Sequence, residues 1–357
     1  MLSMKMNQEV SPFQNDKYQI AWICSNHIEM LPASEMLDRE FGEPQIPLKT
    51  DKEYAMTLGI MGNHKIVILN LLTEENGDEC GSALVAELLA KFPQIRFGVM
   101  VGVGAGIPDY EGDEVRDIRV GDVVVGSYKA DDGGVFVYDG WEPYTILGTF
   151  NAPPRCLRPA VVGLQTRRGE CMSRVSARIN NMLEKRAHMA KTWRRPDATT
   201  DLLYRSGYDK DDGGICSGWK EAQEVSRRDW ERRSTIDPFI HCGGIAISSE
   251  SVEDGRTRDR IHSIYPQVFC LDNDLSGVET GFPCLVIRGI SNYADTHRNG
   301  EWLRYAAAAA AAFGTILLHE VSAMDVAGEP TAVEVIQRAT KFLHAMSTRV
   351  NMKDMHI

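Results

Sequence analysis

The stretch from Phe282 to Asp295 constrains the fold of this chain more than any other. Its apolar part, Cys284–Ile287, shows no polar alternation, which is the pattern of a strand buried on both faces. Arg288 is the first charge on this strand, and Ser291 and Asn292 follow where the strand should end. Because ligands of open α/β sheets bind beyond the carboxyl ends of the strands, these polar residues predict a binding site there.

Strands and helices alternate along most of the chain. Strands are expected at residues 18–24, 54–61, 65–71, 97–103, 119–126 (a turn, then a strand), 133–138, 240–247, 267–271 and 284–287. Helices are expected after the cap Ser25-Asn26, at 82–91, 157–190 and 218–232, within 249–264, and at 272–279, 302–321 and 331–346. The segments 54–61 and 65–71 should form a β-hairpin that turns at Gly62-Asn63, and 133–138 should pair beside 119–126. This alternation predicts an α/β fold with a largely parallel sheet covered on both faces.

The length of 357 residues fits one large domain with an insertion, or two domains. Between about 150 and 238 the composition becomes less apolar, which we interpret as a helical and loop insertion. We therefore expect a flexible arm at 1–16, one domain at 17–325 that contains this insertion, and a C-terminal helix at 326–357.

Composition excludes several classes of function. The net charge of −11, with no basic stripe, argues against nucleic acid as a partner. We expect no membrane span, since no run reaches 18 apolar residues, and no signal peptide, since the opening residues lack an apolar stretch. The eight cysteines show no CxxC spacing, which indicates reduced thiols in a cytoplasmic protein. No acidic loop has regular ligand spacing, so we expect no metal and no cofactor.

The glycine-rich turn at 101–106 follows a strand and could hold a dinucleotide pyrophosphate. The next residues, Ile107-Pro108-Asp109, do not suit a helix N-terminus that binds phosphate. A dinucleotide-binding fold is therefore disfavoured.

Several stretches together resemble the nucleoside phosphorylase superfamily, which includes purine and uridine phosphorylases, methylthioadenosine nucleosidases and a branch found in fungal proteins. These stretches are residues 20–29, 97–106, 117–125, 254–260, 282–297 and 305–313. The resemblance covers about residues 18–320. It implies a three-layer α/β/α domain with a central mixed, mostly parallel sheet that often forms a distorted barrel. It also implies a small-molecule substrate and a homo-oligomer, a dimer or higher.

Two residues match the active site of this superfamily. Glu29 matches the glutamate that activates water in the nucleosidases, and Arg288 matches an arginine of the same site. The family cleaves N-ribosyl bonds with a carboxylic acid that protonates the leaving base.

Other positions depart from the family pattern. The catalytic aspartate is replaced by Asn292, whose amide cannot transfer a proton. The ribose-binding Met-Glu pair falls on Asn273-Asp274. Where phosphorylases carry an arginine and a hydroxyl residue for phosphate, this chain has Met100 and Val103.

Further substrate contacts are expected around the same pocket. Gly104 and Ala105 lie in the glycine-rich turn, where alanine replaces a glycine of the family. Ser248 opens a loop in which Val252 replaces the aromatic residue that stacks on the base. Ser291 follows the key strand. The pocket thus departs from the family pattern at many positions, whereas the rest of the chain resembles the family. This contrast indicates that the fold serves a different function here.

Three hypotheses follow. The favoured one is an enzyme acting on a non-nucleoside small molecule, with a Diels–Alder-type cyclase of secondary metabolism as the best guess. Asn292, Asn273 and Arg288 would then polarise a carbonyl, with Asp274 and Glu29 in the same catalytic set. The alternatives are a purine nucleosidase or phosphorylase, and a non-catalytic ligand-binding relative. Arg288 could instead form a buried ion pair with Glu29 or Asp274.

Overall fold

The computed structural model describes residues 11–42, 56–70, 80–110, 115–126, 134–150, 152–208, 224–225, 235–273, 281–298 and 300–341. The strands are β1 (Ile20–Cys24), β2 (Arg39–Phe41), β3 (Met56–Met61), β4 (His64–Asn70), β5 (Phe97–Gly106), β6 (Val123–Gly126), β7 (Val135–Tyr138), β8 (Ile146–Thr149), β9 (Ile240–Ile247), β10 (Val268–Asp272) and β11 (Cys284–Asn292). The helices are α1 (His27–Glu35), α2 (Cys80–Lys91), α3 (Leu157–Thr166), α4 (Arg168–Lys185), α5 (Ala190–Trp193), α7 (Gly255–Ile264), α8 (Leu303–Glu320) and α9 (Ala323–Gly328), and three short 3-10 helices are Asn15–Lys17, Ala198–Thr200 and Gly300–Trp302.

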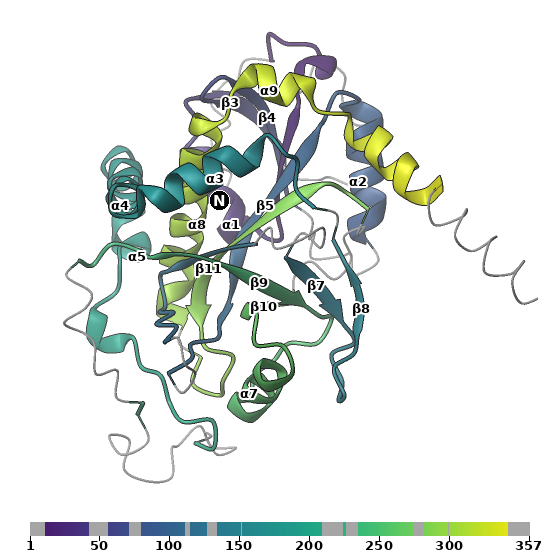
Figure 1. The fold of residues 1–357 in the computed structure, drawn as a ribbon. Coiled ribbons are helices and arrows are strands. Elements are labelled where there is room, and N and C mark those ends of the chain that lie inside the picture. The colour runs from purple at the N-terminus through teal and green to yellow at the C-terminus, as the bar shows by residue number, and fades with distance from the viewer. Residues whose placement is uncertain are drawn as a thin grey trace, which may run out of the picture.

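These strands form one mixed sheet in the order β2-β3-β4-β1-β5-β11-β6-β9-β7-β8, and β10 pairs with both β5 and β9 (Figure 1). The centre is parallel, because β1 runs parallel to β4 and β5, and β11 runs parallel to β5. β6 is antiparallel to β11 and parallel to β9. The pairings of β5, β11, β6, β9 and β10 therefore close a circuit, which brings β5, β10 and β11 together.

Small residues set how closely the long helix α8 approaches the sheet. Residues 306–312 are all alanine and all buried, and α8 packs on β11 and β5. Gly289 of β11 lies directly against the backbone of Ala306, so a β-carbon at Gly289 would collide with it. Gly314 makes a similar close approach to the ring of Trp22 in β1. The alanine run thus serves as a close-packed helix of the core.

Three local predictions are confirmed. β3 and β4 form the predicted antiparallel hairpin, with Gly62 in the turn at φ +61°. β9 has the predicted bounds. Asn26 caps α1, since its side-chain oxygen accepts the backbone N–H groups of Ile28 and Glu29.

Several element bounds and pairings were wrong. β5 and β11 run further than predicted, because their parallel ladder continues through Ile290 opposite Gly104 and resumes at Asn292 opposite Ala105. The helix predicted at 157–190 is divided into α3, α4 and α5, and Arg167 with ψ +41° separates the first two. β7 pairs with β8 and β9 and not with β6, because it joins β9 beyond the residues that β6 contacts.

Other predictions fall largely outside the described residues. Of the helix predicted at 218–232, only 224–225 are described, and there Glu224 forms an isolated β-bridge with Tyr204. Of the helix predicted at 272–279, Asp272 instead ends β10. Residues 332–341 are helical, as predicted for that region. The domain limits and the three-layer arrangement stay predictions. Among the described residues, no helix is both long and apolar enough to cross a membrane.

Candidate functional site

A cavity of about 160 Å³ lies where β5, β10 and β11 end. Seven of the predicted site residues line it: Val103, Gly104, Ala105, Val252, Asn273, Ser291 and Asn292. The other lining residues are Tyr138, Glu250, Ser251, Leu271, Asp272, Arg298 and Leu303. The prediction that these strand ends form one pocket is therefore consistent with the geometry.

The close crossing of β10 over β5 explains the glycine at position 104. Leu271 of β10 lies opposite Ala105 of β5 in an antiparallel pairing. A β-carbon at Gly104 would lie 2.5 Å from the sulfur of Cys270 and 3.0 Å from the backbone oxygen of Leu271. Glycine therefore allows the two strands to cross at this wall of the cavity.

Asn292 uses its side-chain amide within its own turn. Its Oδ1 accepts the backbone N–H of Ala294 at 2.9 Å, and its Nδ2 donates to the hydroxyl of Ser291 at 3.0 Å. Ala294 has φ +52°, a left-handed conformation that such an asparagine turn stabilises. The amide of Asn292 thus shapes the exit of β11.

Arg288 forms a buried ion pair. The sequence had left open whether this arginine contacts a ligand or forms such a pair. Its Nε donates to Oδ2 of Asp272 at 2.7 Å, and each side chain is 1% exposed. Its Nη1 also donates to the backbone oxygens of Met100 and Ile287. The ion-pair partner is thus Asp272 and not Glu29, one of the two partners that were expected. The other, Asp274, lies outside the described residues. Asp272 was missed because the sequence assigned it to the start of a helix.

Glu29 is buried beside the cavity and ties β1 to β5. Its Oε2 accepts the backbone N–H of Ser25 at 2.7 Å, and its Oε1 accepts that of Val103 at 2.9 Å. Gly102 leaves the space that this carboxylate fills, since a β-carbon there would collide with it. Both carboxylate oxygens of Glu29 therefore hold backbone groups, and the residue does not line the cavity.

Two predicted substrate contacts lie outside the cavity wall. The side chain of Met100 is fully buried in the hydrophobic core. Ser248 is also fully buried, and its hydroxyl accepts the backbone N–H of Glu250 at 3.1 Å. Neither residue is part of the cavity wall, although the hydroxyl of Ser248 bonds to Glu250 and Tyr138, which are.

The sequence did not indicate the polar residues at the mouth and far wall. Arg298 donates to Glu253 at 2.8 Å and to Ser251 at 2.9 Å, which joins the loop after β9 to the loop after β11. Burial raises the pKa of Tyr138 to about 12, so its hydroxyl stays protonated and can donate. Tyr138 is the last residue of a predicted strand. The expectation that ligands bind at the carboxyl ends of strands could therefore have included it among the site residues.

Neither a metal centre nor a reactive thiol is evident in the described ranges. No group of three or more His, Cys, Asp or Glu residues there could hold a metal ion. Burial raises the pKa of Cys270 and Cys284 above the ordinary range, so both thiols stay protonated and serve as core residues.

Comparison with known proteins supports the fold. No family model matches the chain. A nucleotide-binding leucine-rich repeat (NLR)-like protein of Hyaloscypha variabilis is 30% identical over 311 residues, which are 86% of this chain and 30% of the relative's length. The chain thus spans about a third of that relative.

A putative 5'-methylthioadenosine/S-adenosylhomocysteine nucleosidase from Borrelia burgdorferi, bound to adenine, has a similar structure. The TM-score is 0.53 at 12% identity, covering 85% of this chain and all of that one. The nucleosidase of Neisseria meningitidis in complex with methylthio-immucillin-A has a TM-score of 0.49 at 13% identity, with 85% and 100% covered. The Borrelia structure confirms the mixed α/β fold that the resemblance implied. At this identity the likeness shows the fold alone.

Proposed function

We propose that the cavity at β5, β10 and β11 binds a purine base or nucleoside, and that the protein does not cleave the N-ribosyl bond. The observation that carries this proposal is how the side-chain amide of Asn292 is used. By the sequence resemblance its amide takes the place of the family's acid, and both ends of that amide hold the turn after β11. General acid catalysis typically contributes roughly 10²–10⁴-fold, so its loss removes much of the hydrolytic rate.

The size and lining of the cavity support a planar heterocycle. The volume of about 160 Å³ is many times the roughly 10–15 Å³ that a cavity needs to hold one water, so a small planar base has room there. Leu271, Val252 and Leu303 supply apolar wall, and Tyr138 and Ser251 add hydroxyl groups. The cavity therefore combines apolar wall with many polar groups, and a purine has both an apolar ring face and hydrogen-bonding ring edges. The adenine bound to the Borrelia nucleosidase is consistent with such a ligand.

The cyclase hypothesis receives less support from the geometry. It requires Arg288, Asn273 and Asn292 as donors to a substrate carbonyl. Arg288 instead donates to Asp272 and to two backbone oxygens, and the amide of Asn292 is used in its turn. We therefore favour the ligand-binding alternative. The homo-oligomer, the cytoplasmic location and the lack of nucleic acid stay predictions.

Calorimetric titration with adenine and adenosine tests the proposal. We expect saturable binding by the wild-type chain, and a loss of about tenfold or more for Val252→Trp, which fills the cavity. Val162→Trp is the matched control, because Val162 is exposed on α3 and should leave binding unchanged. Absence of binding at millimolar ligand, or equal affinity of both variants, would overturn the assignment.

A further inference from the structure

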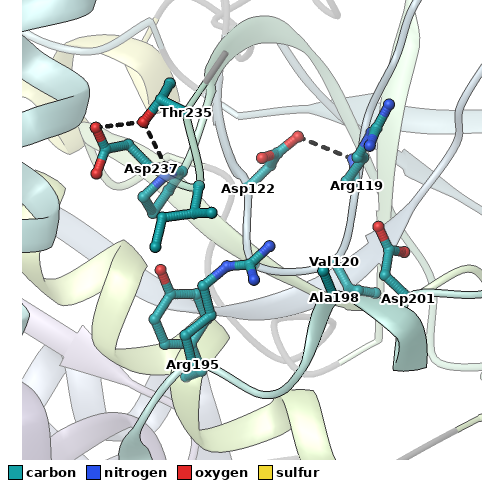
Figure 2. A pocket seen from close by; sticks show the side chains of 12 residues that line it. Arg119, Val120, Asp122, Arg195, Ala198, Asp201, Thr235 and Asp237 are labelled. Atoms are coloured by element: carbon teal, nitrogen blue, oxygen red, sulfur yellow. Dashed lines mark hydrogen bonds between the residues drawn. The ribbon is translucent and has the colours of Figure 1, made fainter. Parts of the chain in front are cut away.

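A second cavity, of about 180 Å³, lies apart from the first and shares none of its lining residues. It is bounded by the turn before β6, the segment that follows α5, the segment that precedes β9, and α8 (Figure 2). Three of these walls are polar and carry charged side chains of both signs. The cavity opens into a wider groove along α4, with which it shares Arg195 and Asp237.

Arg195 provides a fixed positive charge in this cavity. Its guanidinium lies 5.0 Å from the ring centroid of Trp302 and hydrogen-bonds to the hydroxyl of Tyr305. Its Nη1 also donates a long hydrogen bond, 3.4 Å, to the backbone oxygen of Pro196. No carboxylate of the described residues pairs with Arg195 within 4.0 Å. Aromatic packing therefore holds the guanidinium in place, and the nearby carboxylate of Asp197 acts on it only through space.

Asp237, in the segment before β9, provides a negative charge where the cavity meets the groove along α4. Its carboxylate accepts three hydroxyl groups, from Ser176 at 2.5 Å, Thr235 at 2.7 Å and Ser173 at 3.3 Å. Burial alone would raise the pKa of Asp237, but these hydrogen bonds outweigh it and leave the pKa below its ordinary value. Asp237 is therefore ionised at neutral pH, and no Lys or Arg of the described chain pairs with it.

The two other carboxylates of the cavity already serve the fold. Asp122 accepts the backbone N–H groups of Arg119 and Phe239 and the ring of His241. Asp201 accepts the hydroxyl of Tyr293. Figure 2 shows the guanidinium of Arg195 directed into the cavity on the side of Asp122, and the carboxylate of Asp237 directed toward Thr235.

This charge pattern disfavours ligands of a single sign. A simple anion would meet the carboxylates of Asp122, Asp201 and Asp237, and a simple cation would meet the guanidinium groups of Arg195 and of Arg119, which pairs with Asp117. A zwitterion compensates both Arg195 and Asp237. Guanidinium binds carboxylate through paired N–H donors, and a carboxylate accepts ammonium donors.

We propose that this second cavity binds a free aliphatic α-amino acid, with its carboxylate on Arg195 and its ammonium group on Asp237. The volume of about 180 Å³ is many times the roughly 10–15 Å³ that a cavity needs to hold one water, so a small amino acid has room there. Val120, Ala198 and Ile236 line the space beside the charged pair, which suits an aliphatic side chain.

Titration calorimetry of the wild-type chain with L-leucine, isocaproate and isoamylamine tests the proposal. Isocaproate lacks the ammonium group and isoamylamine lacks the carboxylate. We expect saturable binding of leucine, and binding of each analogue weaker by about tenfold or more. If neither leucine nor the smaller probe L-alanine shows saturable binding, the proposal is overturned. Isocaproate that binds as tightly as leucine would make this an anion site and would overturn it equally.

Variants then assign the two charges. Arg195→Gln should weaken leucine binding to the level of isoamylamine, and Asp237→Asn should weaken it to the level of isocaproate. Arg194→Gln is the matched control, because Arg194 is exposed and lines only the wider groove. If Asp237→Asn melts early, the comparison of leucine with isocaproate on the wild type still decides the role of the ammonium group. Unchanged binding by a folded Arg195→Gln variant would refute the assignment.

Discussion

Replacing Arg288 with methionine should destabilise the protein severely, because Asp272 would then be buried without its cation. The two side chains are each 1% exposed, and their 2.7 Å contact joins β11 to β10. Removing one partner of such a pair costs about 3–5 kcal/mol, a large part of the 5–15 kcal/mol of a typical domain. With a urea slope of about 3 kcal/mol/M, the unfolding midpoint should fall by about 1 M or more.

Urea unfolding followed by circular dichroism measures this shift. Arg298→Met is the control, because Arg298 pairs with Glu253 at an exposed site, 40% and 62% exposed, and such pairs contribute about 0–1 kcal/mol. The double variant Arg288→Met/Asp272→Leu should recover much of the loss, since no charge then stays buried. If Arg288→Met unfolds at the same midpoint as Arg298→Met, the structural role of this ion pair is refuted.

The remaining predictions use the same unfolding assay. Gly102→Ala should cost about 1–3 kcal/mol, because the new β-carbon would lie 2.6 Å from the carboxyl carbon of Glu29. Gly163→Ala on α3, with its nearest atom at 3.8 Å, should instead gain up to about 1 kcal/mol, and a loss there would contradict the reasoning. Burial raises the pKa of Asp254, but hydrogen bonds from Thr257 and the N-terminus of α7 outweigh it and lower the pKa overall. Wild type should therefore exceed Asp254→Asn in stability above a pH of about 4, and the difference should vanish as the pH falls through the lowered pKa. A difference that persists in acid would exclude this origin.

Much of the sheet could be predicted because its strands carry local signals. The hairpin of β3 and β4 has Gly62-Asn63 between two apolar runs, and β9 is an apolar run with clear limits. The ends of β5 and β11 could not be placed, because glycine and polar residues continue a ladder there that only the partner strand supports. The break at Arg167 has no proline or capping residue that would signal it.

The candidate site could be predicted only where residues share a strand end. Val103, Ala105 and Asn292 lie at the ends of neighbouring parallel strands, so their proximity follows from the strand-end argument. The pairing of Asp272 with Arg288 depends on how β10 crosses β5, which no local pattern encodes. Tyr138 reaches the cavity from a distant strand for the same reason.

The central claim is that the protein binds a purine nucleoside and does not cleave its N-ribosyl bond. The most direct test is to incubate the protein with adenosine or methylthioadenosine, with and without phosphate, and to measure free adenine by chromatography. The same sample should bind nucleoside by calorimetry yet release no base above the rate in buffer, because the proposal assigns the place of the catalytic acid to Asn292, whose amide cannot transfer a proton. Restoring that acid in Asn292→Asp keeps the oxygen that caps the turn and should raise any base release rather than lower it. Base released by the wild-type chain at ordinary enzymatic rates would contradict the account.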